Sequence, residues 1–92
     1  MNVSHTVKDV AQYMLRRLEK DVYLYQQVIV SDIKREFGDG FVYENANGNL
    51  AIKPNVLKEF RKLTEHDTVW ERGSRLWRKR ETFDTPGKRQ TD

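Results

Sequence analysis

Residues 69–81 read VWERGSRLWRKRE, two short runs with large apolar residues on either side of an RGSR segment. Such runs flanking a glycine-containing turn predict a β-hairpin over roughly residues 68–80. One register of this hairpin pairs Trp70 with Trp77, and a shift of one residue instead places Trp70 beside Leu76. The pattern does not choose between the two registers. In either register, the large aromatic rings are expected to close the core of a small domain.

A second hairpin is predicted upstream, where residues 41–52 read FVYENANGNLAI. Asn47-Gly48 is the preferred dipeptide for a two-residue type I′ turn. That turn pairs Tyr43 with Ile52 and places both on one apolar face of the hairpin. Because side chains alternate along a strand, the choice of turn decides which residues are buried.

Three segments carry apolar residues at every third or fourth position, which predicts helices over residues 6–20, 29–38 and 54–65. Thr6 and Asp9 have the spacing of a capping box at the start of the first helix. The segment DVYLYQQV between the first two helices is rich in β-branched and aromatic residues, which predicts a short strand.

The ends of the second and third helices also carry signals. Ser31 is predicted to cap the start of the second helix, and Gly38 is predicted to end it. Pro54 suits the first position of the third helix. The buried stripe of that helix is predicted to comprise Val56, Leu57, Phe60, Leu63 and Thr64.

These elements predict an α+β fold of three helices with two β-hairpins, in a single domain over residues 1–81 with a flexible polar tail over residues 82–92. Their order resembles a winged helix-turn-helix domain, in which the segment 54–65 would be the recognition helix and the terminal hairpin the wing. A helix-turn-helix normally joins its two helices by a 3–4-residue turn. In this chain roughly fifteen residues, including the hairpin over 41–52, lie between them.

The strings FVYENANGNLAI, VLKEFRKLT and VWERGSRLWRKRE are also similar to a family of small bacterial proteins of unknown function. This resemblance covers the chain from about Tyr25 to Gln90. It implies a compact, winged-helix-like domain. It carries over no catalytic or binding residues, because the family has no established activity.

Composition limits the classes of protein that fit the chain. The 92 residues include no cysteine, which excludes a disulfide framework and a thiolate metal site. There is no apolar run long enough to span a membrane, and the first residues lack the apolar core of a signal peptide. We therefore expect a cytoplasmic protein with no membrane association.

Positive charge is concentrated in the second half of the chain. Residues 1–46 carry 6 basic and 7 acidic side chains, whereas residues 47–92 carry 11 basic and 7 acidic ones. This asymmetry favours a polyanionic partner, and its plain alternative is a solvated surface that keeps the protein soluble.

The candidate nucleic-acid contacts lie on the third helix and the terminal hairpin. On these elements the predicted phosphate-binding residues are Lys58, Arg61, Lys62, Arg72, Arg75, Arg78, Lys79 and Arg80. The hypothesis is a DNA-binding module that uses these groups on double-stranded DNA. The alternative is a protein-interaction or homodimerisation domain that uses the tryptophan- and arginine-rich hairpin, since these residue types are enriched at interface hot spots.

Catalytic signals are weak. Neither His5 nor His66 has the spacing of a metal site, and no nucleophile or phosphate-loop motif occurs. The segment Gly38-Asp39-Gly40 follows a predicted helix, so we expect a sharp turn there and no phosphate site. The expectation is a protein that is not an enzyme and that holds neither a metal nor a cofactor.

Overall fold

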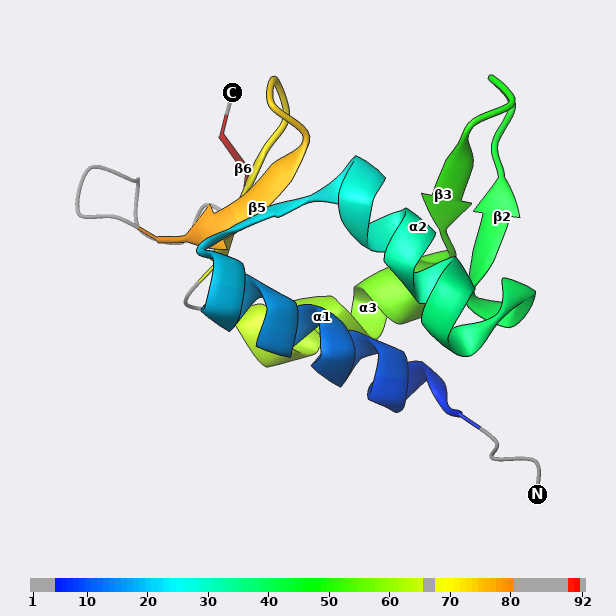
Figure 1. Cartoon of the computed structure of the whole chain (residues 1–92). Coiled ribbons are helices and arrows are strands. Elements are labelled where there is room, and N and C mark those ends of the chain that lie inside the picture. Colours follow the sequence, from blue (N-terminus) through cyan, green and yellow to red (C-terminus); the bar gives the residue numbers. More distant parts are fainter. Residues whose placement is uncertain (1–4, 66–67, 81–89, 92) are drawn as a thin grey trace.

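The computed structural model describes residues 5–65, 68–80 and 90–91, arranged as Figure 1 shows. These residues form an α+β fold with two small sheets, as expected from the sequence. The helices are α1 (Val7–Asp21), α2 (Gln26–Phe37), the 3₁₀ helix η1 (Asp39–Phe41) and α3 (Pro54–Thr64). The strands are β1 (Tyr23–Tyr25), β2 (Val42–Glu44), β3 (Leu50–Ile52), β4 (Thr68–Glu71), β5 (Leu76–Lys79) and β6 (Gln90–Thr91).

The larger sheet has the strand order β1-β5-β4-β6, and the smaller one is the β2–β3 hairpin. Strand β5 pairs antiparallel with both β1 and β4, whereas β6 runs parallel to β4. Strand β6 falls within the stretch that was predicted to be a tail; residues 82–89 and 92 of that stretch lie outside the described residues. Strand β1, which follows α1, is far from the terminal hairpin in sequence. The two are joined by the pairing of β1 with β5.

The register of the terminal hairpin is the one that pairs Trp70 with Trp77. The two indole rings have their centroids 4.6 Å apart, and the Trp77 ring meets the ring of Phe60 edge-on at 5.3 Å. Leu24 lies opposite Trp77 in β1 and is buried as well. This face of the sheet therefore packs on the helices, and the two tryptophans belong to the core.

Helices α1 and α3 pack against each other, and Figure 1 shows the pair below the larger sheet. The predicted capping box of α1 is confirmed, because the Thr6 hydroxyl accepts from the Asp9 N–H and the Asp9 carboxylate accepts from the Thr6 N–H. The second of these bonds lowers the pKa of Asp9 below its ordinary value. Within the described residues, no helix is long and apolar enough to cross a membrane.

The buried stripe of α3 is narrower than predicted. Val56, Phe60 and Thr64 are buried at four-residue spacing, and Leu57 is half-buried. Leu63 was predicted to be buried, but 43% of it is exposed. The stripe is narrow because α3 packs mainly against a single neighbour, α1, and one partner helix covers little more than one row of side chains.

The second helix begins three residues earlier than predicted, at Gln26 instead of Ile29. The Gln26 N–H donates to the carbonyl of Arg75 (3.0 Å), so the chain passes directly from β1 into α2. Ser31 is therefore not a cap but lies inside the helix, where its hydroxyl donates to the carbonyl of Gln27. Gly38 ends the helix as predicted, with a φ of +86°.

The β2–β3 hairpin differs from the prediction by one residue of register. Asn45 organises its loop: its side-chain oxygen accepts from the N–H groups of Asn47 and Asn49, and its carbonyl accepts from the N–H of Gly48. Gly48 has a φ of +78°, the conformation that closes a three-residue loop after a type I turn. The two-residue type I′ turn predicted at Asn47-Gly48 is therefore wrong.

The change of register moves every side chain of β2 to the other face. Val42 now pairs with Ile52, and both are buried. Tyr43, which was predicted to lie on the apolar face, instead pairs with Ala51 and is 43% exposed. The strand thus buries its β-branched residue and leaves the phenol in solvent.

A polar network joins α1 to α2. The guanidinium of Arg17 donates to Asp32 (2.6 Å) and to the hydroxyl of Tyr13 (2.9 Å), and it also pairs with Asp21 (3.3 Å). Asp32 is buried and pairs on its other oxygen with Arg35 (2.9 Å). The hydrogen bond to Asp32 raises the pKa of Arg17, so the guanidinium remains charged and the contact holds the two helices together.

Replacing Asp32 by alanine is expected to lower the free energy of unfolding by about 1–3 kcal/mol. The loss should stay below that of a fully buried pair, because Arg17 is partly solvated and keeps its contact with Asp21. Urea denaturation measures the effect, with Glu19→Ala on the exposed face of α1 as the control. Equal stability of Asp32→Ala and the wild-type chain would contradict the assigned role of this network.

Candidate nucleic-acid interface

Arg78 differs from the other basic residues of the terminal hairpin. Its side chain is only 8% exposed, and its Nε–H donates to the carboxylate of Glu71. Its Nη1 group also donates to the carbonyl of Lys79 (3.1 Å). Arg78 and Glu71 each follow a tryptophan directly in their strands, so by alternation both point to the face of the sheet opposite the tryptophans. Arg78 was predicted to contact phosphate; in the structure its guanidinium braces the hairpin through Glu71 and the carbonyl of Lys79.

The remaining basic residues of the hairpin lie at its two ends. Arg72 and Arg75 are exposed at the tip, and Lys79 is exposed at the base with Arg80 half-buried beside it. Four residue steps separate Arg75 from Lys79, or about 13 Å at ~3.3 Å per residue. Among the described residues, neither Arg75 nor Lys79 forms an ion pair.

Helix α3 exposes its three predicted contact residues. Lys58, Arg61 and Lys62 are all in solvent, and their three- and four-residue spacing places them on one side of the helix. Lys62 pairs with Glu59 (3.2 Å). In the described part of the chain, Lys58 and Arg61 have no such acidic partner.

Local ion pairs take up two of the acidic side chains in this half of the chain. Glu59 is engaged by Lys62, and Glu71 is engaged by Arg78. These two acids are thereby less able to offset the other cations nearby. The positive potential is therefore expected to be centred on Lys58 and Arg61 of α3 and on Arg75 and Lys79 of the hairpin.

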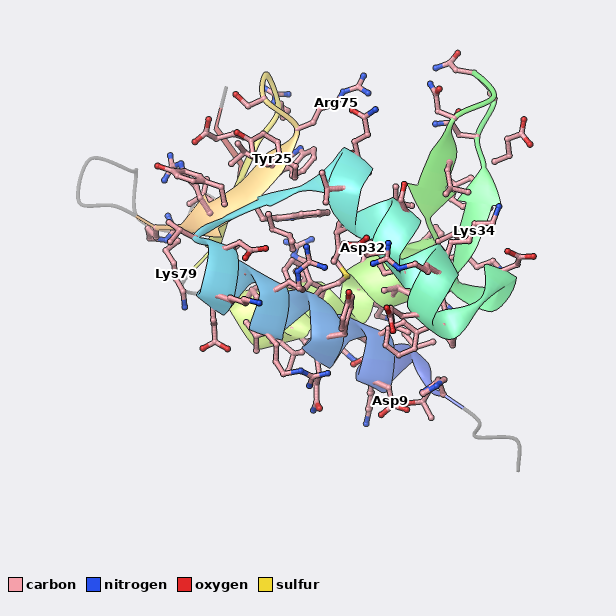
Figure 2. All side chains as sticks on the ribbon, viewed as in Figure 1. Asp9, Tyr25, Asp32, Lys34, Arg75 and Lys79 are labelled. Carbon is pink, nitrogen blue, oxygen red and sulfur yellow. The ribbon has the colours of Figure 1, made fainter. Side chains whose placement is uncertain are left out.

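The structure brings together only part of the predicted basic surface. Lys79 pairs with Thr68, the first residue of β4, so it lies at the end of the hairpin that follows α3. Arg75 lies at the opposite end, beside the start of α2, as Figure 2 shows. The base of the hairpin thus adjoins α3, whereas its tip adjoins α2.

Neither histidine forms part of a described catalytic or metal constellation. The ring of His5 packs edge-on against Phe37 with 4.8 Å between centroids, and His66 lies outside the described residues. In the described ranges, no group of three histidine, aspartate or glutamate side chains is placed to hold a metal ion. In the segment Gly38-Asp39-Gly40, Gly38 ends α2 and the other two residues belong to η1, so the chain turns there as predicted.

The sequence did not predict a groove of about 530 Å³ between the two hairpins. It is bordered by the first turns of α2, by the tip of the terminal hairpin and by β3 with its loop. Its lining comprises Tyr25, Gln26, Gln27, Val28, Val30, Ser31, Asn45, Asn49, Leu50, Ala51, Gly73, Ser74 and Arg75. Among the described residues, no acidic side chain belongs to this lining. No sequence signal marked the groove, because the half exposure of its large apolar residues Tyr25 and Val28 is seen only in the structure.

Comparison with known proteins supplies one match. Residues 6–79 match a protein family described as a family of unknown function (DUF6953). No curated protein and no solved structure matches the chain. The matched residues span all three α-helices and both hairpins. The predicted resemblance to a family of unknown function is confirmed, over residues 6–79 and not from about Tyr25 to Gln90.

Arg78 and Lys79 are neighbouring cations that are expected to contribute differently to the stability of the fold. Arg78→Ala is expected to lower the free energy of unfolding by about 1–3 kcal/mol, because it leaves Glu71 without its charged partner. Lys79→Ala, one residue along the strand and exposed, should change stability by no more than about 0.5 kcal/mol. Denaturant unfolding of the two variants makes the comparison, and equal losses would refute the distinction between them.

Proposed function

The chain belongs to the family of unknown function DUF6953, and we propose that it is a small, non-enzymatic module that binds nucleic acid, with double-stranded DNA as the leading candidate. The proposal rests on one observation. The basic half of the chain exposes cations that no acidic side chain of the described residues neutralises, namely Lys58, Arg61, Arg75 and Lys79. Exposed, uncompensated cations are what a phosphate backbone attracts.

The chemistry of such contacts is simple. Lysine and arginine side chains neutralise phosphates and release condensed counterions, which gives affinity without sequence information. Arg78 is left out of the contact set because Glu71 already binds it. The proposed contacts include no stacking of bases on the tryptophans, because Trp77 is buried and Trp70 is packed against it.

The arrangement of the strands supports a winged-helix interpretation. Strand β1, which follows α1, pairs with the terminal hairpin, and α3 directly precedes that hairpin. The β2–β3 hairpin stands between α2 and α3 in sequence, but it projects away from α3 in Figure 1. One departure is that α3 packs mainly against α1, so α2 and α3 do not form the closely packed pair of a helix-turn-helix. In this proposal α3 and the hairpin contact DNA from the outside, through phosphates.

A cytoplasmic location in a bacterium forms part of the same proposal, because the DNA is found there.

A protein partner is the second candidate function. The half-exposed side chains of Tyr25 and Val28 favour it, since exposed aromatic and apolar residues beside a groove are typical of interaction surfaces.

Charge reversal on α3 tests the DNA proposal. The double variant Lys58→Glu/Arg61→Glu is expected to lose most of its affinity for a labelled random-sequence duplex, measured by fluorescence anisotropy. Affinity of the wild-type chain should fall steeply with salt, and the slope of log K against log salt should flatten by about one unit for each phosphate that the variant no longer neutralises.

The matched control reverses two exposed cations on α1, Lys8→Glu/Arg16→Glu, and so imposes the same change of net charge. It should retain the larger part of the affinity, because α1 is not part of the proposed contact surface. If both double variants lose affinity equally, the attraction is a property of net charge and not of this surface. No binding by the wild-type chain even at low salt would rule out the proposed function.

A further inference from the structure

The groove between the two hairpins is bordered by β3, whose outer edge pairs with no other strand of the described residues. In an antiparallel pair, hydrogen-bonded and non-bonded residue pairs alternate. The Asn45 N–H donates to the Asn49 carbonyl (2.8 Å), and the Lys53 N–H donates to the Phe41 carbonyl (3.0 Å). The bonded pair between these two is Tyr43 with Ala51, and Leu50 belongs to a non-bonded pair.

The backbone N–H and C=O of Leu50 therefore point away from β2, toward the outer edge of β3. None of the hydrogen bonds found among the described residues uses either group. Leu50 and Ala51 both line the groove, and Figure 1 shows β3 on the side of its hairpin that faces α2 and the terminal hairpin. An open edge of this kind is a template for another strand.

The charge at the groove is positive. Within the part of the chain that the structure describes, Arg75 at the tip of the terminal hairpin is the one charged residue that lines the groove, and it forms no ion pair there. The groove also meets the start of α2, which has no side-chain cap at Tyr25 and no acidic residue in its first turn. The positive end of the helix dipole therefore adds to the charge of Arg75.

The walls of the groove offer apolar contact as well. About half of Tyr25 and of Val28 is exposed, and both line the groove with the half-buried Leu50. In strand addition, main-chain hydrogen bonds supply affinity, and pockets for alternate side chains supply specificity. The lining of this groove offers both main-chain hydrogen-bonding groups and apolar side chains.

We propose that this groove binds an extended acidic peptide segment of a partner protein, which adds to β3 as a further strand. The main chain of the peptide pairs with the N–H and C=O of Leu50, and its acidic side chains lie toward Arg75 and the start of α2. Strand β3 has three residues, so about three peptide residues pair with it, over ~10 Å. An open strand edge favours a peptide over a nucleic acid, because only another main chain repeats the donor and acceptor at the matching spacing.

The test uses the full chain and a fluorescent peptide of about ten residues that alternates glutamate with valine, long enough to extend past both ends of β3. The acidic peptide should bind, and its counterpart alternating lysine with valine should not. Arg75→Glu should weaken binding at least about tenfold. The control is Lys79→Glu, the same charge reversal at the other end of β5, which should leave peptide affinity unchanged.

Amide hydrogen exchange locates the bound peptide. The Leu50 amide should exchange faster than the Ala51 amide in the free protein, and it should become protected when the acidic peptide binds. Leu50→Pro removes the outward N–H without removing a bond to β2, so it should abolish binding, while Leu50→Val should retain it. Far-ultraviolet circular dichroism of each variant checks that the fold is intact.

Three results would overturn the proposal. They are failure of the acidic peptide to bind, binding that leaves the Leu50 amide unprotected, and equal loss in Arg75→Glu and Lys79→Glu. Self-association through β3, measured by analytical ultracentrifugation, or protection of Leu50 by a labelled oligothymidylate in place of the peptide would assign the groove to a different occupant. None of these results bears on the contacts proposed for Lys58 and Arg61, so the two proposals fail separately.

Discussion

Trp77 lies in β5, which pairs antiparallel with β1 on one side and with β4 on the other, and it packs against Phe60 of α3 and Trp70 of β4. Large aromatic side chains dominate the energetics of a small domain. The position of Trp77 also fixes the orientation of its neighbours by strict alternation along β5. Arg78 must point to the other face, where Glu71 meets it, and Arg75 and Lys79 are left at the two ends.

The two surfaces proposed for function both depend on that strand. The base of the hairpin is held beside α3, which brings Lys79 to the same end of the molecule as the last turn of α3. The tip is held beside α2 by the bond from the Gln26 N–H to the Arg75 carbonyl. One side of the groove is therefore set by the terminal hairpin, and the other is set by the β2–β3 hairpin packed on α2.

Local patterns in the sequence predicted the elements well, because the signals for these elements lie within a few residues of one another. The capping box of Thr6, the stop at Gly38 and the first position of Pro54 are all of this kind. The register of the β2–β3 hairpin was mispredicted because Asn45, two residues before the expected turn, organises a longer loop with its side chain. The start of α2 was mispredicted because a partner some fifty residues away, the carbonyl of Arg75, sets it.

The candidate site was predictable only as a set of cations. The sequence identified the basic side chains of α3 and the terminal hairpin, but it gave no means of separating Arg78, whose partner depends on the register, from exposed Lys79. The groove was not predictable, since its walls come from three segments that are far apart in the chain. One small module can bind phosphate through its basic surface and a peptide through its groove. The two proposed sites use different residues, apart from Arg75.

The most direct test of the nucleic-acid assignment is a map of backbone amide chemical shifts during titration with a random-sequence duplex at low salt. We predict that the shift changes concentrate on Lys58, Arg61 and the segment from Arg75 to Lys79, and that they diminish together as salt is raised. Changes confined to the first turns of α2 and to β3 would contradict the assignment, as would a spectrum that the duplex leaves unchanged.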